Sequence, residues 1–165
     1  MRRIRYSVAM SLDGYIAGPK GEADWIIMDP EIDFGSIFSQ FDTMLLGRKT
    51  YEAAQKYGGS GGMPGMKTYV FSRTLRQSDH PDVTLVAEKP TETLAAIKSR
   101  DGKDIWLMGG GSLFRSLLEV GMVDTVEVAV IPVLLGAGIP LLPSPADQVK
   151  LALTHSKVFE KTGIV

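Results

Sequence analysis

The sequence predicts one α/β domain of 165 residues, with a mostly parallel central sheet and a C-terminal antiparallel hairpin. Three observations favour this class. Short β-branched or apolar runs alternate with segments whose apolar residues recur at helical spacing. Turns rich in glycine or hydroxyl groups follow several of these runs, as at the strand-to-helix junctions of parallel sheets. The chain is long enough for one ordinary core, and no repeat or linker divides it.

The first half of the chain alternates between strands and helices. In residues 31–41 (EIDFGSIFSQF) the side chains of Phe34, Ile37, Phe38 and Phe41 share one helical face. On the following helix Glu52 and Lys56 are spaced for an i,i+4 ion pair. The expected elements are strand 4–10, loop 11–30, helix 31–41, strand 43–46, helix 48–57 and flexible loop 58–65.

The second half continues the alternation. Pro90 marks a helix start, because proline is favoured in the first turn. Leu113, Leu117 and Leu118 share one helical face, and a long β-branched run follows that helix. The expected elements are strand 68–71, strand 83–86, helix 91–99, strand 105–108, helix 112–120, strand 125–133 and a hairpin within 151–164.

Composition excludes several classes of function. The net charge is −1, the pI is about 6.1 and no polybasic run is present, so neither nucleic acid nor an anionic membrane is an expected partner. Without cysteine there is no disulfide, thiolate metal site or cysteine nucleophile, and His80 and His155 alone cannot form a histidine-rich metal site. These counts leave a carboxylate magnesium site open, but no residue is assigned to a metal. The N-terminus lacks a signal-peptide pattern, which favours the cytoplasm.

Three strand-to-helix or strand-to-loop junctions are suited to phosphate. The run IWLMGGGSLF (105–114) places three glycines between a strand and a helix, where backbone N–H groups can hold an anion. LLGRKT (45–50) adds a hydroxyl and two cations at another helix start, and VFSRT (70–74) ends a strand in two hydroxyls and a guanidinium. Taken alone, each has an ordinary explanation as a turn or a solvated surface. Because ligands bind outside the carboxyl ends of parallel strands, together they favour a cofactor with several phosphates, such as a dinucleotide.

Familiar nucleotide motifs are absent. Phe114 stands where G-x-G-x-x-G needs its third glycine, and the chain holds neither a P-loop nor a G-x-S-x-G elbow.

Five stretches occur in an order that carries a family resemblance: SVAMSLDGYIAG (7–18), LLGRKTYE (45–52), PGMKTYVFSR (64–73), IWLMGGGSLFRSLLEVGMVDTVEV (105–128) and IPVLLGAGIPLLP (131–143). Together they resemble the dihydrofolate reductase-like superfamily, and most closely the C-terminal reductase domain of the riboflavin-biosynthesis deaminase/reductase. The resemblance implies a three-layer fold over residues 1–165, NADPH as cofactor and hydride transfer.

The resemblance also implies roles for single residues. Ala9 and residues Ile16, Ala17 and Gly18 would flank the nicotinamide, and Gly47, Arg48, Lys49 and Thr50 would hold the pyrophosphate and its surroundings. Ser72, Arg73 and the adjacent Thr74 would meet the adenosine 2′-phosphate. Gly109, Gly110, Gly111, Ser112 and Leu113 would lie along the cofactor, with a cis peptide between the first two glycines.

The catalytic and substrate residues are less defined. An ungapped count back from Gly47 places the family's acidic residue at Glu31, and Asp33 is the alternative. Either carboxylate also suits a helix cap or solvent. Asp13 and Trp25 are candidates for the substrate side, although a tryptophan in a loop is also explained by packing.

The substrate is not fixed by the resemblance. Met66 stands where folate enzymes carry an arginine for the folate tail, and no threonine occurs in residues 126–130. Riboflavin-pathway reductases often have an Asp-rich segment after the position of Thr50, whereas EAAQKYGGSGG has no aspartate.

The leading hypothesis is therefore an NADPH-dependent reductase of a small heterocycle, of the 5-amino-6-(5-phosphoribosylamino)uracil reductase type. Dihydrofolate reduction and a non-catalytic nucleotide-binding module are the alternatives. The apolar stretch VAVIPVLLGAGIPLL (128–142) favours a homodimer, although a buried strand and loop would also explain it.

Overall fold

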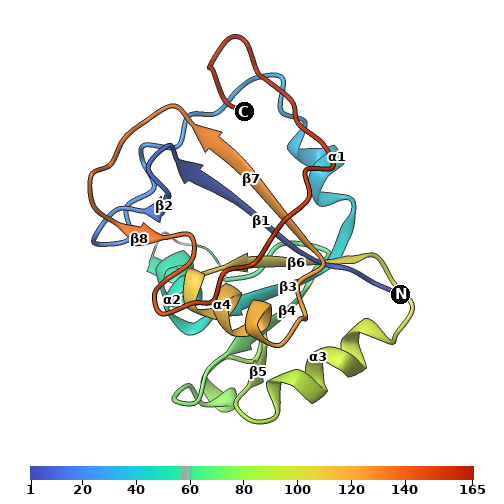
Figure 1. Cartoon of the computed structure of the whole chain (residues 1–165). Helices are drawn as coiled ribbons and strands as arrows, with labels where there is room; N and C mark the ends of the chain where they lie inside the picture. The colour runs from blue at the N-terminus through green and yellow to red at the C-terminus, as the bar shows by residue number, and fades with distance from the viewer. Residues whose placement is uncertain (57–58, 60) are drawn as a thin grey trace.

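Six parallel strands form the central sheet of the computed structural model, which describes residues 1–56, 59 and 61–165 (Figure 1). The strand order is β5-β4-β3-β6-β1-β7, and β2 pairs with β8 in a separate antiparallel pair. The strands are β1 (Ile4–Ser11), β2 (Tyr15–Ala17), β3 (Phe41–Gly47), β4 (Lys67–Phe71), β5 (Thr84–Val86), β6 (Asp104–Gly109), β7 (Thr125–Ile131) and β8 (Ile139–Pro140).

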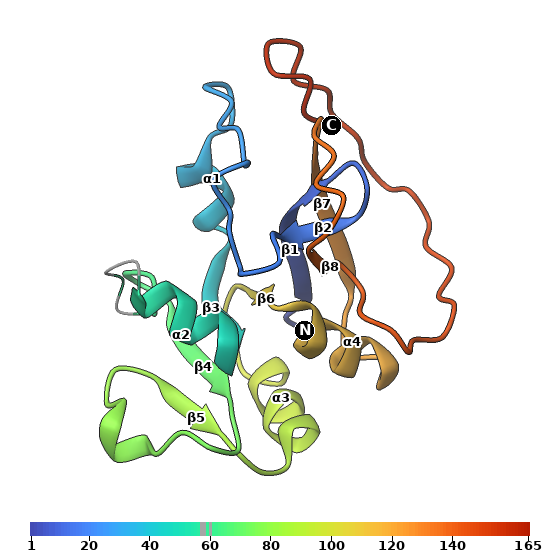
Figure 2. The same cartoon turned by 90° about the vertical axis from the view of Figure 1, so that its left-hand side faces the viewer.

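Helices cover both faces of this sheet, and each covers one set of alternating strand residues. On one face Leu94 and Phe114 pack against a core that includes Tyr6 and Leu107. On the other face Tyr51 and Phe38 pack with Trp106 and its neighbours. Figure 2 shows α1 and α2 together on this second side. The helices are α1 (Phe34–Phe38), α2 (Arg48–Lys56), α3 (Pro90–Lys98) and α4 (Gly111–Glu119), with a short 3₁₀ turn at Gln77–Asp79.

The first helix is shorter than predicted, because α1 spans Phe34–Phe38 rather than residues 31–41. Asp33 caps it by accepting a hydrogen bond from the backbone N–H of Ser36 at 2.9 Å. Gly35, Ser36 and Ser39 are weak helix formers, so little propensity extends the helix. Phe41, expected on that helix, instead begins β3 and is buried beneath the Arg5 guanidinium.

The C-terminal segment also differs from the prediction. The hairpin expected within residues 151–164 is reduced to one antiparallel bridge between Phe159 and Ile164. Val165 exchanges two backbone hydrogen bonds with Val130 of β7. The additional antiparallel pair comes from β2 and β8, and β2 lies inside the segment predicted to be a loop.

Smaller differences concern element ends. The strand predicted to reach residue 133 ends at Ile131, just before Pro132, which has no N–H for a ladder. Glu52 pairs with Arg48 rather than with Lys56, at 3.1 Å. Tyr57, Gly58 and Ser60, which belong to the predicted helix end and flexible loop, lie outside the described residues.

Candidate cofactor and substrate site

The strands β3, β4 and β6 are neighbours and end side by side. β3 and β6 end in glycine, and a turn with two hydroxyl groups follows β4. Gly47 ends β3 opposite Phe71 at the end of β4, and Leu46 lies opposite Gly109 at the end of β6. A Cβ atom on Gly47 would lie 3.6 Å from the backbone oxygen of Gly109 and 3.7 Å from the backbone nitrogen of Gly110. The predicted junctions after β3, β4 and β6 are therefore brought together at the edge of the sheet formed by the carboxyl ends of its strands.

The triple glycine has a distinct role at each position. Gly109 has φ of +132°, a conformation that favours glycine, and the predicted cis bond between Gly109 and Gly110 is confirmed. A Cβ on Gly110 would lie 3.1 Å from the Thr50 hydroxyl oxygen, so Thr50 of α2 closely approaches the backbone here. A Cβ on Gly111 would lie 2.7 Å from the backbone oxygen of Pro140, which leaves no room for a side chain.

Two helices begin at this edge. α2 follows β3 directly at Arg48, and α4 begins at Gly111. Within the part of the chain that the structure describes, no side chain caps α4 at Gly110. The first N–H groups of a helix have no partner inside the helix, and they carry a partial positive charge that attracts anions. Ser112 and Leu113, two of the predicted cofactor residues, lie in the first turn of α4.

The turn after β4 places a cation at the same edge of the sheet. Ser72 is buried, and its hydroxyl accepts hydrogen bonds from the backbone N–H groups of Thr74 at 3.2 Å and Leu75 at 3.1 Å. This turn holds Arg73 at the surface, where the guanidinium has no ion-pair partner among the described residues. Lys49 is exposed too, whereas Arg48 is paired with Glu52.

The residues expected around the nicotinamide lie on β1 and β2. Ala9 is half-buried on β1, opposite Ala129 of β7. Ile16 and Ala17 form most of β2, and a Cβ on Gly138 would lie only 2.2 Å from the backbone oxygen of Ala17. The N–H of Gly18, the next residue, donates to the backbone oxygen of Glu22 at 2.8 Å.

The two candidate substrate residues make contacts within the protein. Asp13 accepts hydrogen bonds from Ser11 at 2.6 Å and from the backbone N–H groups of Leu135 and Gly136 at 3.1 and 2.7 Å. These bonds, that from Ser11 most of all, lower the pKa of Asp13. The Trp25 indole donates to the backbone oxygen of Glu22 at 3.0 Å. Asp13 thus ties the turn before β8 to the end of β1.

The two candidate acids lie at the entrance to α1, and both are exposed. Glu31 pairs with Lys161 at 3.1 Å, and Asp33 caps the helix. The nearby Asp29 is the buried carboxylate, with 2% of its surface exposed. It accepts hydrogen bonds from Thr162 at 2.6 Å and from the backbone N–H of Glu31 at 2.8 Å, which tie the segment before α1 to the C-terminus.

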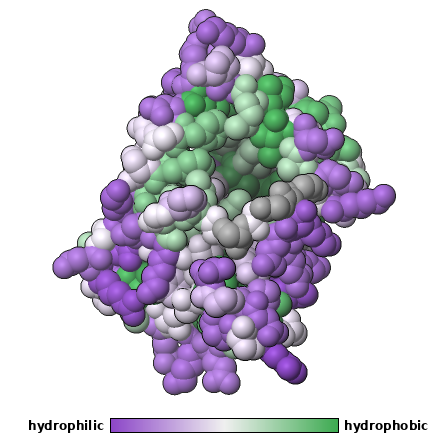
Figure 3. All heavy atoms as spheres, turned by 180° about the vertical axis from the view of Figure 1, so that it is seen from behind, coloured by the Kyte–Doolittle hydropathy of each residue, from purple (hydrophilic) through white to green (hydrophobic). Residues whose placement is uncertain are grey.

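An apolar hollow opens on the side of the sheet that α1 and α2 cover (Figure 3). On this side the Phe38 ring of α1 packs at a tilt of 35° against Trp106 of β6, with ring centroids 5.0 Å apart. Met66 and Met108 pack against the same core. Farther across the sheet, β1 and β7 present Ser7, Ala9 and Ala129 on the same face, because partner residues on parallel strands point the same way. Small side chains therefore follow large ones across this face.

An ion pair on this face, between Arg5 and Glu127, was not predicted from the sequence. Arg5 of β1 binds both carboxylate oxygens of Glu127 on β7, with Nε–Oε1 and Nη2–Oε2 distances of 2.6 and 2.9 Å. The bond from Arg5 to Glu127 is the largest factor raising the pKa of Arg5. The only signal was a single charge within each of two otherwise uncharged strand patterns, IRYSVAM and TVEVAVI.

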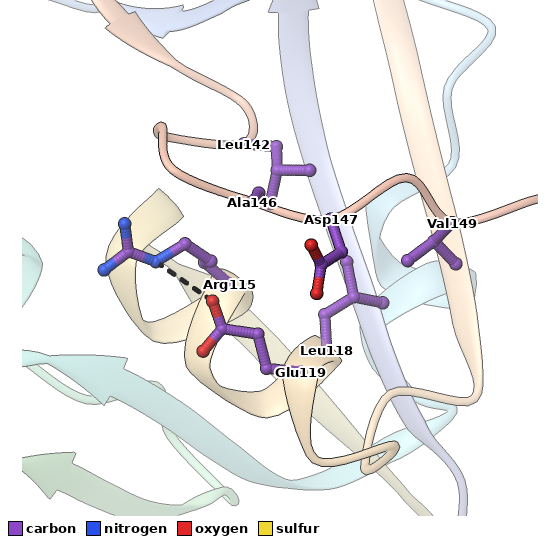
Figure 4. Close-up of a pocket in the computed structure, with 7 residues that line it drawn as sticks. All are labelled: Arg115, Leu118, Glu119, Leu142, Ala146, Asp147 and Val149. Atoms are coloured by element: carbon purple, nitrogen blue, oxygen red, sulfur yellow. Dashed lines mark ion pairs between the residues drawn. The ribbon is translucent and has the colours of Figure 1, made fainter.

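A cavity of about 150 Å³ lies elsewhere, between α4 and the segment after β8 (Figure 4). None of its lining residues is a predicted site residue: they are Arg115, Leu118, Glu119, Leu142, Ala146, Asp147 and Val149. Arg115 donates hydrogen bonds to the backbone oxygens of Ser144 and Pro145, at 3.2 and 3.3 Å, which fixes one wall of the cavity.

Residues 1–56, 59 and 61–165 contain neither a membrane-spanning helix nor a cluster of metal-ligating side chains. No helix in these ranges has the length and apolar character to cross a membrane. The same ranges contain no group of three or more His, Cys, Asp and Glu side chains arranged to hold a metal ion.

The fold and this edge define a class of protein. Glycine backbone at the ends of β3 and β6, two helix starts and an arginine after β4 that has no ion-pair partner in the described part of the chain together suit a ligand with separated phosphates. A dinucleotide therefore fits the residues present. The fold is that of the dihydrofolate reductase-like proteins: dihydrofolate reductase from Enterococcus faecalis, in complex with NADP(H), superposes with a TM-score of 0.68 at 20% identity over 98% of this chain and 90% of that one.

The chain belongs to the RibD C-terminal domain family, whose sequence model matches residues 2–165. It is 35% identical to the uncharacterized protein YyaP of Bacillus subtilis, over 99% of this chain and 92% of YyaP. A putative riboflavin biosynthesis protein from Shewanella sp. PV-4 has a similar structure, with a TM-score of 0.81 and 25% identity over 99% of this chain and 96% of that one. These similarities support a reductase-type protein.

Proposed function

We propose that this protein is an NADPH-dependent reductase that transfers a hydride to a small heterocycle, as a riboflavin-pathway reductase does. The observation that carries the proposal is the meeting of Gly47, Gly109 and Gly110 beside two helix starts. Three residues without side chains let a ligand approach the backbone closely, and the helix starts favour its negative charge. The proposed setting is the cytoplasm.

In the proposed complex, the residues at the edge divide the cofactor between them. Thr50 and the first turns of α2 and α4 bind the pyrophosphate, and Ser72, Arg73 and Thr74 bind the 2′-phosphate. Ala9 and the β2 residues position the nicotinamide. The cofactor supplies the hydride when bound, and the protein supplies position and a proton.

The proton donor is proposed to be Glu31 or Asp33. Both precede or begin α1, whose Phe38 lies against Trp106 on the hollowed face. Their present partners differ, because Glu31 is held by Lys161 and Asp33 by the N–H of Ser36. Glu31→Gln and Asp33→Asn separate the two, because only the variant that loses the donor should have a lower kcat with little change in NADPH affinity. Asparagine at position 33 still accepts a hydrogen bond from the Ser36 N–H, so Asp33→Asn should keep the helix cap.

The proposal is tested by cofactor preference. NADPH is expected to bind more tightly than NADH, because a guanidinium grips a phosphate through charge-assisted hydrogen bonds. Such a contact contributes on the order of 1.5–3 kcal/mol, so Arg73→Ala should weaken NADPH about 10- to 100-fold and leave NADH unchanged. Arg76→Ala, a change at an exposed arginine three residues away, is the matched control. Equal wild-type affinities for the two cofactors would refute this cofactor assignment.

Turnover then separates an enzyme from a binding module. NADPH oxidation over a panel of aminopyrimidines, pteridines and small imines is expected with at least one compound. Tight NADPH binding without oxidation of any compound would instead favour a nucleotide-binding module.

A further inference from the structure

The ion pair between Arg5 and Glu127 occupies the face that would lie beneath the substrate. Ser7 and Glu127 are register partners on β1 and β7, and one step along the same face Ala9 is the partner of Ala129. Residues two apart on a strand are separated by roughly 7 Å, about the width of one aromatic ring. A planar ring lying over Ala9 and Ala129 therefore has its edge within reach of the Glu127 carboxylate.

Within residues 1–56, 59 and 61–165, the partners of the Glu127 carboxylate leave one position open for a hydrogen bond. A carboxylate has about four acceptor positions. Oε1 accepts from Arg5 Nε at 2.6 Å and from the Thr125 hydroxyl at 3.1 Å. Oε2 accepts from Arg5 Nη2 at 2.9 Å. The remaining position is on Oε2, and 37% of the Glu127 side chain is exposed, so a ligand can reach it.

Local charge makes this position suited to a neutral donor. Arg5 also approaches Asp104 at 3.4 Å, and Asp104 is paired with Arg3 at 2.6 Å. Two guanidinium groups therefore face two carboxylates, and no uncompensated cation remains in this network. Arg5, with 11% of its side chain exposed, is enclosed by Glu127, Asp104, Gln40 and the Phe41 ring. A phosphate or carboxylate placed here would meet the Glu127 charge without a free cation.

We propose that Glu127, oriented by Arg5, positions the substrate by accepting a hydrogen bond from a neutral N–H or O–H group. This proposal rests on the proposed reductase function, and it defines the substrate class: a planar ring with such a donor on the edge that faces β7, and with no anionic group directly on the ring. Glu127 is a positioning residue, and the proton donor remains a separate group.

Binding of three uracils tests this without turnover. Uracil has two ring N–H groups, 1,3-dimethyluracil has none, and orotate adds a carboxylate to the uracil ring. Titrations of the full chain, followed by protein NMR, are expected to give affinities that decrease from uracil to 1,3-dimethyluracil to orotate. Uracil should bind roughly three- to tenfold more tightly than dimethyluracil, as expected for one charge-assisted hydrogen bond at a partly exposed group.

Variants show whether Glu127 is responsible. Glu127→Gln should remove most of the preference for uracil and strengthen orotate binding, because it removes the repelling charge. Glu127→Asp keeps the charge on a shorter side chain and guards against misfolding of the Gln variant; it should weaken uracil while still rejecting orotate. Glu119→Gln, the same change in a surface pair with Arg115, should leave all three affinities unchanged.

Each negative result has its own meaning. Absence of uracil binding to the wild type would overturn the role of Glu127. The role would also be overturned if Glu127→Gln bound uracil with wild-type affinity and orotate with wild-type affinity. NADPH affinity is measured on the same samples. Failure to bind NADPH, together with Glu127-dependent uracil binding, would refute the reductase function and retain the Glu127 site.

Discussion

Replacing Gly47 with alanine separates what the fold requires from what the cofactor requires. The added Cβ would lie 3.6 Å from Gly109 O, 3.7 Å from Gly110 N and 3.7 Å from the Leu113 Cβ, all ordinary contacts. The φ angle of Gly47 is also outside the region that favours glycine. Because alanine restricts the unfolded chain more than glycine, the variant should be as stable as wild type or more stable by about 0.4–1 kcal/mol.

NADPH binding should respond in the opposite direction. The new methyl group would occupy the space between the end of β3 and the first turn of α4, where the pyrophosphate is proposed to contact the backbone. Loss of one charge-assisted contact corresponds to about 1.5–3 kcal/mol, or roughly 10- to 100-fold in affinity. Fluorescence titration of NADPH measures this change, and thermal unfolding measures stability.

Gly111→Ala provides the comparison. Its Cβ would lie 2.7 Å from the backbone oxygen of Pro140 and 2.9 Å from the Pro143 ring, so this variant should lose about 1–3 kcal/mol of stability through overpacking. A Gly47→Ala protein that is stable and binds NADPH with wild-type affinity would show that the cofactor does not approach the backbone at Gly47.

Three further predictions concern the fold, the assembly and the substrate. The pKa of Asp29 is lowered chiefly by the Thr162 hydrogen bond, so its stabilisation is present above the unfolded pKa of about 3.9 and is lost as pH falls through the lower folded value. The stability difference between wild type and Asp29→Asn, from denaturant titrations, should therefore shrink below about pH 4; a constant difference would contradict this role. Light scattering at micromolar concentration should give the molar mass of the proposed homodimer. Leu134→Asp changes a leucine that is 70% exposed, and it should favour the monomer. A monomer mass for the wild type would reject the dimer. Dihydrofolate should be a poor substrate, because Met66 packs against the core and cannot pair with the carboxylate of the folate tail. Met66→Arg should lower the KM for dihydrofolate. Efficient turnover of dihydrofolate by the wild type, with a micromolar KM, would refute this prediction.

The parallel sheet could be predicted because its signals are local. Apolar runs such as residues 105–108 are buried on both faces of a parallel sheet, and glycine or hydroxyl residues follow them directly. The error at α1 has a local cause too. Phe34, Ile37, Phe38 and Phe41 recur at helical spacing, but pairing of Phe41 with Asp104 draws that residue into β3. Periodicity describes one element, and it does not include the neighbouring strand that competes for its last turn.

The Arg5–Glu127 pair could not be predicted in the same way. The two residues lie 122 positions apart, and they meet only because β1 and β7 become neighbours in the sheet. The ion pair of Glu52 was missed for a different reason. Arg48 and Lys56 both lie four residues from Glu52, so spacing alone allowed either partner.

These differences explain why the two halves of the proposed site carry different amounts of information in the sequence. The cofactor half is built from backbone at Gly47, Gly109 and Gly110, and its requirement for glycine is visible in short motifs. The substrate half is built from side chains on four separate segments: Arg5 on β1, Phe38 on α1, Trp106 on β6 and Glu127 on β7. Any of these side chains can change while the sheet and the glycines remain. Membership of the family is therefore expected to constrain the proposed cofactor more tightly than the proposed substrate, and the charge at Glu127 is the feature of this face that would most directly limit which ring the proposed reductase accepts.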